Sequence, residues 1–545
     1  MSAAATTVPA GDAVPTGGLS RDPFRASARF VWVLALVQIA YQVALLTKGL
    51  DSVVRITCDD AYYYLQTAWN LKLFGFPTFD GINPTNGVQF LWYWLLALVA
   101  LAVPTKMAFL YVSLILCIAA NALCYFAIYR MGKLLARPVL LAAAAGLWFY
   151  LGSRHVLLMG MENSVHGLVF WLLLVEVVRL TIRSRRGEPT TLLWATVLLV
   201  LNVWCRLDAA VFSAGLYLYT LHESVWRSDR WLKKRPSRKA VAASALLAGT
   251  GAAVMFTGFW LMGGSFFPVS GLVKLSQASW KWPILLEIAA RGLDLTNVFL
   301  RPVLDLHPMA GLGVVLALMV TTWVLVAGSY GRSSTMGAGL CKLWGFMAVA
   351  SVVQLLVQAR LGDYVHYGKW YQTPYYVFCI LSTALCADGL VYHLRRLRLW
   401  KLITPTVVVV LLVIVLCSAQ RVSKWLRREA RETNAAVARL RAAEWMSGHL
   451  DPDAICCAHS AGAVGYFSGR TVVNLDGLIN SYSFFSRVLT GEKDCATWLK
   501  ELGAEYYVDE TDAAAAFDRI GTPIANFPAD IVVLKLHYGR RPQER

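Results

Sequence analysis

Long apolar runs follow one another along most of the chain before residue 419. A helix that crosses a lipid bilayer needs about 20 apolar residues. Runs that approach or exceed this length fall at 30–47, 88–104, 106–129, 138–152, 164–182, 190–205, 209–226, 240–262, 309–329, 343–358, 374–392 and 402–418. The pattern predicts an all-α polytopic membrane protein.

Basic clusters between these runs decide how the chain crosses the membrane. They lie at 130–137, 183–186, 227–239, 332–342 and 395–401. Short loops rich in Lys and Arg stay on the cytoplasmic side. All of these clusters are cytoplasmic only if the run at 88–104 does not cross, so we predict a re-entrant or juxtamembrane helix there. The prediction is about eleven transmembrane helices, with the N-terminus in the cytoplasm and the C-terminus outside.

This topology divides the chain into three parts. Residues 1–28 are predicted to be a disordered cytoplasmic tail, since their first part is rich in Ala, Thr, Pro and Gly. Residues 29–418 form the transmembrane domain, and residues 419–545 form an extracytoplasmic domain. The outer loops of the transmembrane domain are 48–105, 153–163, 263–308 and 359–373.

The extracytoplasmic part alternates helical and β-rich segments. Helices are predicted at 428–450, 483–490 and 494–502. The β-rich runs lie at 454–458, 471–475, 506–509 and 531–536. This alternation predicts a small α/β domain.

Two further features of this domain concern glycine and cysteine. The glycine-containing segment 458–465 matches no phosphate-binding loop and is predicted to be a turn. Because the compartment is oxidising, Cys456 or Cys457 could form a disulfide with Cys495.

Composition and charge agree with a membrane protein. The chain is 57% apolar and 15% charged, against about 25% charged residues in a typical soluble domain. These values exclude a disordered chain and an ordinary cytosolic enzyme. The 51 Lys and Arg exceed the 33 Asp and Glu by 18, but much of this surplus lies in the cytoplasmic clusters, so no nucleic-acid partner is expected. The expected location is the inner (plasma) membrane.

The scarce acidic residues on the outer side are candidates for catalysis. Asp59 and Asp60 follow the first span at the start of a predicted helix, where a carboxylate could act as general base or cap the helix. Glu162 lies near the bilayer surface, where an ionisable residue usually lines a cavity. The alternative for Glu162 is an ion pair with Arg154 or His155.

Basic and aromatic residues on the same side are candidates for binding. Lys274, Arg360, His366 and Lys369 lie in or beside outer loops and could bind a phosphate; each alone could equally contact lipid headgroups. Arg206 is a further candidate ligand, with a structural pair to Asp208 as the alternative. Tyr63, beside the acidic pair, could stack on a sugar or anchor at the interface.

In their order and sidedness these segments resemble the GT-C superfamily of integral-membrane glycosyltransferases, which use polyprenyl-phosphate sugars. The residues that carry the resemblance are Asp59-Asp60-Ala61-Tyr62-Tyr63-Tyr64, Gly81-Ile82-Asn83-Pro84-Thr85-Asn86-Gly87 with Leu91-Trp92, Ser153-Arg154-His155 with Gly160-Met161-Glu162-Asn163, Arg206-Leu207-Asp208, and Pro268-Val269-Ser270-Gly271 with Lys274. An acidic pair after the first span is the hallmark of the superfamily. Among its members, terminal arabinofuranosyltransferases of bacteria and protein mannosyltransferases are the most similar.

The resemblance implies the GT-C fold and an inverting transfer of a sugar from a polyprenyl-phosphate-linked donor. The acceptor would be a hydroxyl of a cell-envelope glycan, lipid or protein at the outer face of the membrane. Asp59 or Asp60 would be the general base, and Glu162 a further catalytic acid. No cofactor is expected to be obligatory, although a divalent cation could bind at Asp59 and Asp60. Two other classes stay open: a transporter or flippase of a lipid-linked glycan, and a non-enzymatic scaffold for envelope assembly.

Overall fold

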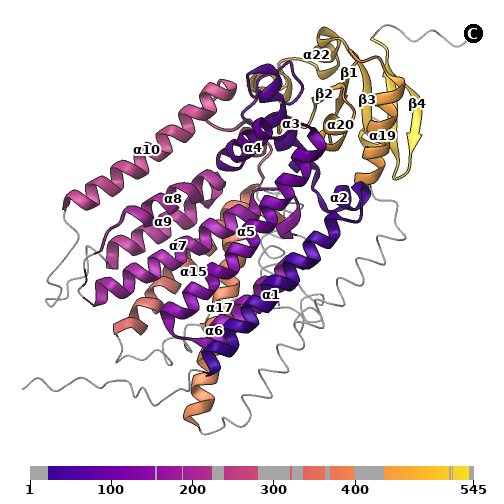
Figure 1. The fold of residues 1–545 in the computed structure, drawn as a ribbon. Helices are drawn as coiled ribbons and strands as arrows, with labels where there is room; N and C mark the ends of the chain where they lie inside the picture. The colour runs from indigo at the N-terminus through magenta and orange to yellow at the C-terminus, as the bar shows by residue number, and fades with distance from the viewer. Residues whose placement is uncertain are drawn as a thin grey trace, which may run out of the picture.

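The fold is seen in a computed structural model (Figure 1). It describes residues 22–153, 156–186, 190–223, 238–279, 335–361, 369–397, 435–514 and 520–538, together with 188, 320–321, 324 and 517. A helical bundle forms one end of the molecule, and a small domain built on a β-sheet covers the other end (Figure 1).

The apolar runs form the helices of the bundle. These are α1 (Asp22–Leu46), α5 (Lys106–Leu135), α6 (Pro138–Gly152), α7 (Asn163–Arg185), α8 (Leu193–Cys205), α9 (Ala210–Leu221), α10 (Arg238–Gly263), α15 (Thr335–Leu361) and α17 (Thr373–Arg396). Among the described residues, 6 helices are long and apolar enough to cross a membrane, and they come from α1, α5, α7, α10, α15 and α17. The chain is therefore a membrane protein. The predicted runs at 309–329 and 402–418 lie outside the described residues, apart from 320–321 and 324.

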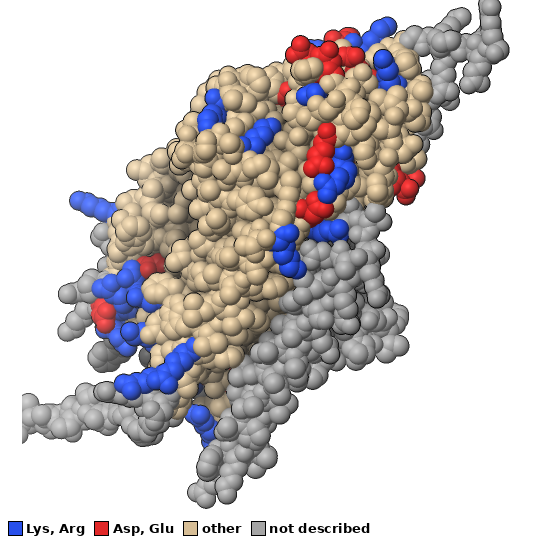
Figure 2. Space-filling model, turned by 45° about the vertical axis from the view of Figure 1, so that its right-hand side comes forward, with Lys and Arg blue, Asp and Glu red and all other residues tan. Residues whose placement is uncertain are grey.

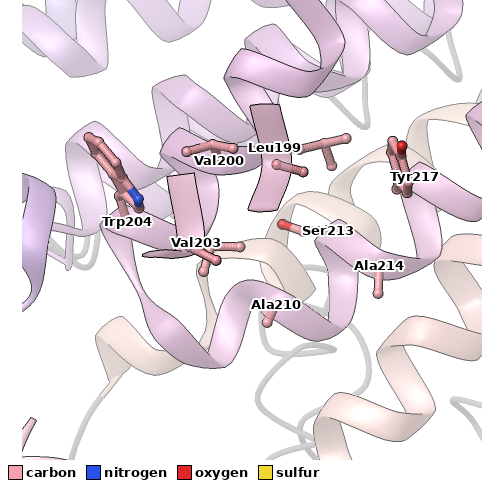
Figure 3. A pocket seen from close by; sticks show the side chains of 10 residues that line it. Leu199, Val200, Val203, Trp204, Ala210, Ser213, Ala214 and Tyr217 are labelled. Carbon is pink, nitrogen blue, oxygen red and sulfur yellow. The ribbon is translucent and has the colours of Figure 1, made fainter. Parts of the chain in front are cut away.

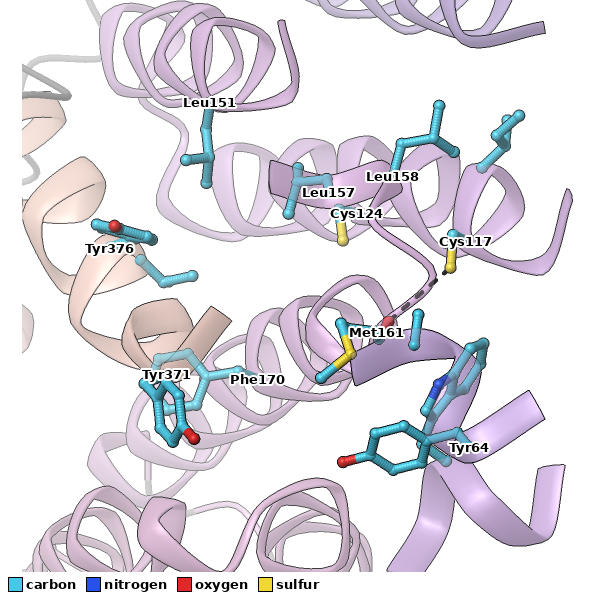
Figure 4. Packing of buried hydrophobic residues seen from close by; sticks show 14 of the residues in the cluster. Tyr64, Cys117, Cys124, Leu151, Leu157, Leu158, Met161, Phe170, Tyr371 and Tyr376 are labelled. Atoms are coloured by element: carbon cyan, nitrogen blue, oxygen red, sulfur yellow. Dashed lines mark hydrogen bonds between the residues drawn. The ribbon is translucent and has the colours of Figure 1, made fainter. Parts of the chain in front are cut away.

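Close contacts between small and large side chains hold the bundle together. On α5, Gly132 lies against Leu141 of α6, since a Cβ on this glycine would lie 2.7 Å from the Leu141 Cβ. On α7, Gly167 lies against Trp148, whose ring meets Trp171 edge-on with centroids 6.1 Å apart. Figure 4 shows part of the resulting apolar core, to which α5, α7 and the start of α17 contribute.

The first predicted outer loop forms three short helices at the end of the bundle that carries the sheet domain. These are α2 (Leu50–Ile56), α3 (Asp59–Phe74) and α4 (Phe90–Ala102). At 1.5 Å per residue, the 13 residues of α4 span roughly 20 Å, which is less than the bilayer core of about 30 Å. Lys72 of α3 donates to the carbonyl groups of Ala100 and Val103 at the end of α4. The last carbonyl groups of the run at 88–104 thus accept hydrogen bonds from a lysine of the protein itself.

The aromatic residues of α4 lie mainly inside the protein. Trp92 and Tyr93 are buried, and only Trp94 is exposed, by 39%. The Trp92 indole donates to the carbonyl of Gly160 at 3.2 Å. The reason is that α4 packs against the bundle and α3, so three of its four aromatic side chains, including Phe90, face protein.

The C-terminal domain contains a five-stranded mixed sheet. Its strands are β1 (Ile455–Ala458), β2 (Thr471–Asn474), β3 (Ala504–Glu510), β4 (Gly521–Phe527) and β5 (Ile531–Leu536), in the order β2-β1-β3-β5-β4. Strand β1 pairs in parallel with β2 and β3, with Cys456 opposite Val472 and Tyr506. Strand β5 pairs in antiparallel with β3 and β4. The helical elements are α19 (Ala435–His449), α20 (Gly462–Phe467), α21 (Tyr482–Phe484), a π-helical turn (Phe485–Leu489), α22 (Cys495–Leu502) and α23 (Thr511–Ala514).

Two expectations for this domain are wrong. The segment predicted to be a turn contains the first residues of helix α20, because Gly462 and Ala463 begin a short helix that packs on α3. Cys456, Cys457 and Cys495 are free thiols, and the Cys457 thiol donates to the carbonyl of Tyr506 at 3.4 Å. The Cys457 thiol is therefore bonded to a backbone carbonyl of the same sheet and not to a second cysteine.

The C-terminal domain packs directly on α2 and α3. The rings of Tyr62 and Tyr466 lie 5.4 Å apart, and the Thr85 hydroxyl donates to the carbonyl of Asn480 at 2.9 Å. The cluster of buried apolar residues continues from the bundle into this domain. Figure 2 shows basic side chains gathered at the end of the bundle remote from the domain, where α5, α7 and α17 end in basic residues.

Candidate functional site

Asp59 joins the bundle to the C-terminal domain. Its carboxylate accepts hydrogen bonds from the backbone N–H groups of Gly462 and Ala463, at 3.0 and 2.9 Å. The first N–H groups of a helix have no partner within it and favour a carboxylate. The contact also requires glycine, since a Cβ at residue 462 would lie 2.1 Å from the carbonyl oxygen of Asp59.

Asp60, the next residue, has different surroundings. Among the described residues, no group donates a hydrogen bond to its carboxylate, which is partly exposed. Burial raises the pKa of Asp60 to about 6 against the opposing charge of Lys274, while Asp59 and Glu162 raise it further. A carboxylate with a pKa near neutrality is suited to accept a proton.

Lys274 reaches this site from α11 (Val269–Ser276). Asn86 fixes the start of that helix, because its side-chain oxygen accepts from the Val269 N–H at 2.9 Å. The Asn86 amide nitrogen donates to the carbonyl groups of Phe259 and Ser265, at 3.0 and 2.8 Å. One buried asparagine therefore sets the turn between α10 and α11.

The ammonium group of Lys274 lies 5.0 Å from the centre of the Tyr371 ring. Burial alone would lower the pKa of Lys274, but the nearby Tyr371 and Asp60 outweigh it and the pKa is raised. Lys274 is therefore a cation at neutral pH beside Asp60, as a phosphate ligand must be.

Arg206 is buried between two acids. Its guanidinium pairs with Glu162 and lies 2.9 Å from Asp208 Oδ1, and its side chain is 4% exposed. The structural pair between Arg206 and Asp208 is present, as one of the two interpretations predicted. Glu162 pairs with Arg206, while Arg154 and His155 lie outside the described residues. Because buried charges need partners, this triad positions Glu162.

Tyr371 and Tyr64 complete the described boundary of the site. The Arg206 guanidinium lies 4.3 Å from the centre of the Tyr371 ring, which also contacts Lys274. Figure 4 shows the Tyr64 and Tyr371 hydroxyl groups pointing toward each other. The charges of Glu162, Arg206 and Asp60 all act on Tyr64, so these side chains surround one common region.

Tyr63 points to the C-terminal domain, where sequence reasoning missed a fourth carboxylate. The Tyr63 hydroxyl donates to Asp476 Oδ2 at 2.9 Å, and the Asn474 amide donates to Tyr63 at 3.1 Å. Burial raises the pKa of Asp476 to about 7, and the charge of Asp60 adds to the shift. Asp476 follows the carboxyl end of the parallel strand β2, and this position is the signal that could have identified it.

The remaining predicted cations are described only in part. Arg360 lies near the end of α15, and its Nη1 atom is buried without a hydrogen-bond partner among the described residues. Lys369 begins the short helix Lys369–Gln372, but its side chain lies outside the description, as does all of His366.

The acids that the structure describes at the site do not form a recognisable metal centre. No group of three or more His, Cys, Asp or Glu side chains that could hold a metal ion occurs in the described part of the chain. Asp59 already binds two N–H groups, so a divalent cation at the acidic pair would depend mainly on Asp60.

An apolar cavity of about 220 Å³ lies beside the outer end of α8. Figure 3 shows side chains of α8 and α9 that line it. The lining includes Leu199, Val203, Trp204, Ala210, Ser213 and Ala248. Trp204 and Ala210 flank the Arg206–Asp208 segment in the sequence, so the cavity begins close to the charged site.

Comparisons with known proteins place the fold. A family model described as "Domain of unknown function (DUF8728)" matches residues 421–540. Comparison with curated protein sequences finds no match. The apo oligosaccharyltransferase of Archaeoglobus fulgidus aligns with a TM-score of 0.54 and 12% identity, over 94% of this chain and 74% of that chain.

A second structure of that archaeal oligosaccharyltransferase, AglB, in complex with an inhibitory peptide and a dolichol-phosphate, gives a TM-score of 0.51 at 14% identity. It covers 94% of this chain and 74% of the other. At this level of identity the likeness shows the fold alone, and that fold is the GT-C fold expected from the sequence motifs.

Proposed function

We propose that this protein is an inverting glycosyltransferase of the GT-C type. It moves a sugar from a polyprenyl-phosphate-linked donor to a hydroxyl of a cell-envelope glycan, lipid or protein. The sequence motifs resemble those of bacterial terminal arabinofuranosyltransferases and protein mannosyltransferases, so the sugar proposed is a pentose or a hexose. The membrane is the inner (plasma) membrane, and the site faces outward.

The observation that carries this proposal is the contrast between two neighbouring carboxylates in a GT-C fold. Asp59 is bonded to the backbone of the C-terminal domain. Asp60 accepts no hydrogen bond from a described residue and has a pKa of about 6 beside a lysine. Asp60 is therefore the general base in this proposal, and Asp59 is a positioning residue.

The reaction follows from these groups as a single displacement. The acceptor hydroxyl gives its proton to Asp60 while its oxygen forms a bond to the anomeric carbon of the sugar. The bond between that carbon and the phosphate oxygen breaks, and the lipid phosphate leaves with both bonding electrons. Because the new bond forms opposite the one that breaks, the configuration inverts.

Lys274 stabilises the phosphate as its negative charge grows. Preorganised charges of this kind usually provide the largest part of catalysis. Arg206 contributes indirectly, since its guanidinium already pairs with Glu162 and Asp208 and contacts the Tyr371 ring. Glu162 contributes to catalysis indirectly, through its ion pair with Arg206. Arg360, His366 and Lys369 are additional cations for the phosphate in this proposal.

Three observations support a lipid-linked donor at the outer face. The apolar cavity beside Trp204 offers apolar walls next to the charged site, as an isoprenoid tail requires. The basic helix ends lie at the opposite end of the bundle (Figure 2), as expected for the cytoplasmic side. The archaeal oligosaccharyltransferase was solved with a dolichol-phosphate, a lipid phosphate of the proposed class.

Transfer by the purified full chain tests the proposal. Synthetic polyprenyl phosphates that carry mannose, glucose or arabinofuranose are incubated with the protein in nanodiscs and envelope extract of the native host. Release of the lipid phosphate is measured. Asp60→Asn is expected to slow release by about 10²–10⁴-fold, whereas Asp51→Asn, a change at an exposed acid of α2, serves as control.

Unchanged release in the Asp60→Asn variant would contradict the assignment of the base. Release that never occurs, together with movement of the intact lipid-linked sugar across vesicles, would favour the transporter interpretation. The absence of both release and movement would favour the scaffold interpretation.

A further inference from the structure

Three buried glutamines beside the charged site leave amide atoms without hydrogen-bond partners. Gln354 and Gln358 lie on α15, Gln372 lies at the start of α17, and each is at most 1% exposed. Among the described residues, the amide oxygens of Gln354 and Gln358 and both amide atoms of Gln372 have no partner. Buried polar atoms are nearly always hydrogen-bonded, so each exception requires an explanation.

Two of the glutamines contact residues that neighbour the charged groups of the site. Gln354 Nε2 lies 3.5 Å from Asp208 Oδ2, and Gln358 Nε2 donates to the carbonyl of Tyr371 at 3.1 Å. Four residues apart on a helix, these two side chains lie on one face. Asp208 pairs with Arg206, and Tyr371 contacts both Arg206 and Lys274. The amides of Gln354 and Gln358 thus lie beside residues that surround the site, and Gln372 directly follows Tyr371 in the chain.

The chemistry of the unpartnered atoms points to a ligand rich in hydroxyl groups. The unpartnered oxygens of all three amides are acceptors, which a phosphate without O–H groups cannot satisfy and a sugar ring can. Lys274, in contrast, carries donors only and suits the phosphate. The two sets of groups therefore match the two parts of a sugar phosphate.

We propose that Gln354, Gln358 and Gln372 form the subsite for the sugar ring of the lipid-linked donor. This inference rests on the proposed function and extends it to the residues that select the sugar. The phosphate lies at Lys274, the sugar hydroxyl groups donate to the amide oxygens beside Tyr371, and Asp60 faces the acceptor.

Binding of lipid phosphates with and without a sugar tests the subsite. The probes are farnesyl phosphate and farnesyl phosphates that carry mannose, glucose or arabinofuranose, titrated calorimetrically into the full chain in nanodiscs. The wild type is expected to bind at least one sugar-carrying probe about tenfold or more tightly than farnesyl phosphate. Gln354→Met and Gln358→Met each lose most of this difference, because methionine keeps the length of the side chain without its acceptor.

Two measurements separate loss of the subsite from loss of folding. Affinity for farnesyl phosphate is expected to stay unchanged in both variants. Gln42→Met is the matched control, because Gln42 is buried on α1 and both its amide atoms also lack a partner among the described residues. The difference between the probes is expected to persist in Gln42→Met.

Several results would overturn the subsite. The first is an affinity difference between sugar-carrying and bare farnesyl phosphate that survives in the double variant Gln354→Met/Gln358→Met. The second is a parallel loss of affinity for farnesyl phosphate in these variants. The third is a wild type that binds all sugar-carrying probes no more tightly than the bare lipid phosphate. A wild type that binds none of the four probes would overturn the proposed function as well.

Discussion

The start of α3 has two faces, one toward the C-terminal domain and one toward the bundle. Asp59 and Tyr63 lie on the first face, four residues apart, and both bond to that domain. Asp60 and Tyr64 lie on the second face at the same spacing, near Arg206 and Glu162. Since successive helical residues are rotated by about 100°, one residue of offset separates two kinds of environment.

The two faces differ in how their polar groups are satisfied. On the domain face, both carboxylate oxygens of Asp59 and the hydroxyl of Tyr63 have a backbone or side-chain partner at hydrogen-bond distance. On the bundle face, charged side chains lie beside other charged side chains and aromatic rings. Asp60 accepts no hydrogen bond from the described residues. Satisfied groups stabilise a fold, and incompletely satisfied ones are available for chemistry. The predictions below test this division.

The largest expected effect is on stability at the bundle face. Arg206→Met leaves the buried Glu162 and the partly buried Asp208 without this counter-charge, which is expected to lower the free energy of unfolding by about 3–5 kcal/mol. Denaturant unfolding in detergent measures the change. Arg441→Met breaks the exposed pair with Asp51 and is expected to cost about 0–1 kcal/mol. Equal losses in the two variants would refute the structural role of Arg206.

The next effect is kinetic. Lys274→Met removes the cation beside Asp60 and is expected to lower kcat by about 10²-fold. Affinity for farnesyl phosphate is also expected to fall, because the phosphate loses its charge partner. Lys500→Met, at an exposed position of helix α22, is the control. Normal kcat and normal affinity in Lys274→Met would show that Lys274 is not part of the site.

The rate is expected to depend on pH through Asp60. A general base must be ionised, so activity is complete above the pKa of about 6 and falls about tenfold for each pH unit below it. Lys274, Asp59 and Glu162 are the charged groups that set this pKa. Rates between pH 4 and 8, with the folded fraction followed by fluorescence, measure the inflection.

Asp476 provides the control for this profile, because its pKa of about 7 could give a similar curve. Asp476→Asn is expected to keep the inflection near pH 6, since Asp476 bonds to Tyr63 on the domain face. If the inflection disappeared in this variant, the general base would be Asp476 and not Asp60.

Much of the fold could be predicted from the sequence, because membrane helices and buried strands have strong apolar signals. Four strands of the C-terminal sheet lie at or within one or two residues of their predicted positions. Strand β4 was missed, since it is an edge strand that contains Gly521 and Pro523 and is largely exposed. Helix α20 was missed because its six residues include two glycines and depend on packing against α3.

The candidate site was only partly predictable for a related reason. The motif identified Asp59 and Asp60 as a pair, but their difference arises from partners far along the chain. Asp59 bonds to residues more than 400 positions away, and Lys274 reaches Asp60 only through the turn fixed by Asn86. Short sequence motifs do not encode such distant contacts, so the roles of two adjacent acids required the structure.

The smallest expected effect is at the domain face, where Asp59→Asn keeps one acceptor oxygen and loses the other. Stability of the C-terminal domain is expected to fall by about 1–2 kcal/mol, with activity reduced less than about tenfold. Gly462→Ala perturbs the same contact from the other side, since its Cβ would lie 2.1 Å from the Asp59 carbonyl oxygen. Hydrogen exchange of the α20 amides is expected to rise in both variants and to stay unchanged in Asp60→Asn. If Asp59→Asn instead abolished activity with normal exchange at α20, the division of roles between the two faces of α3 would be wrong.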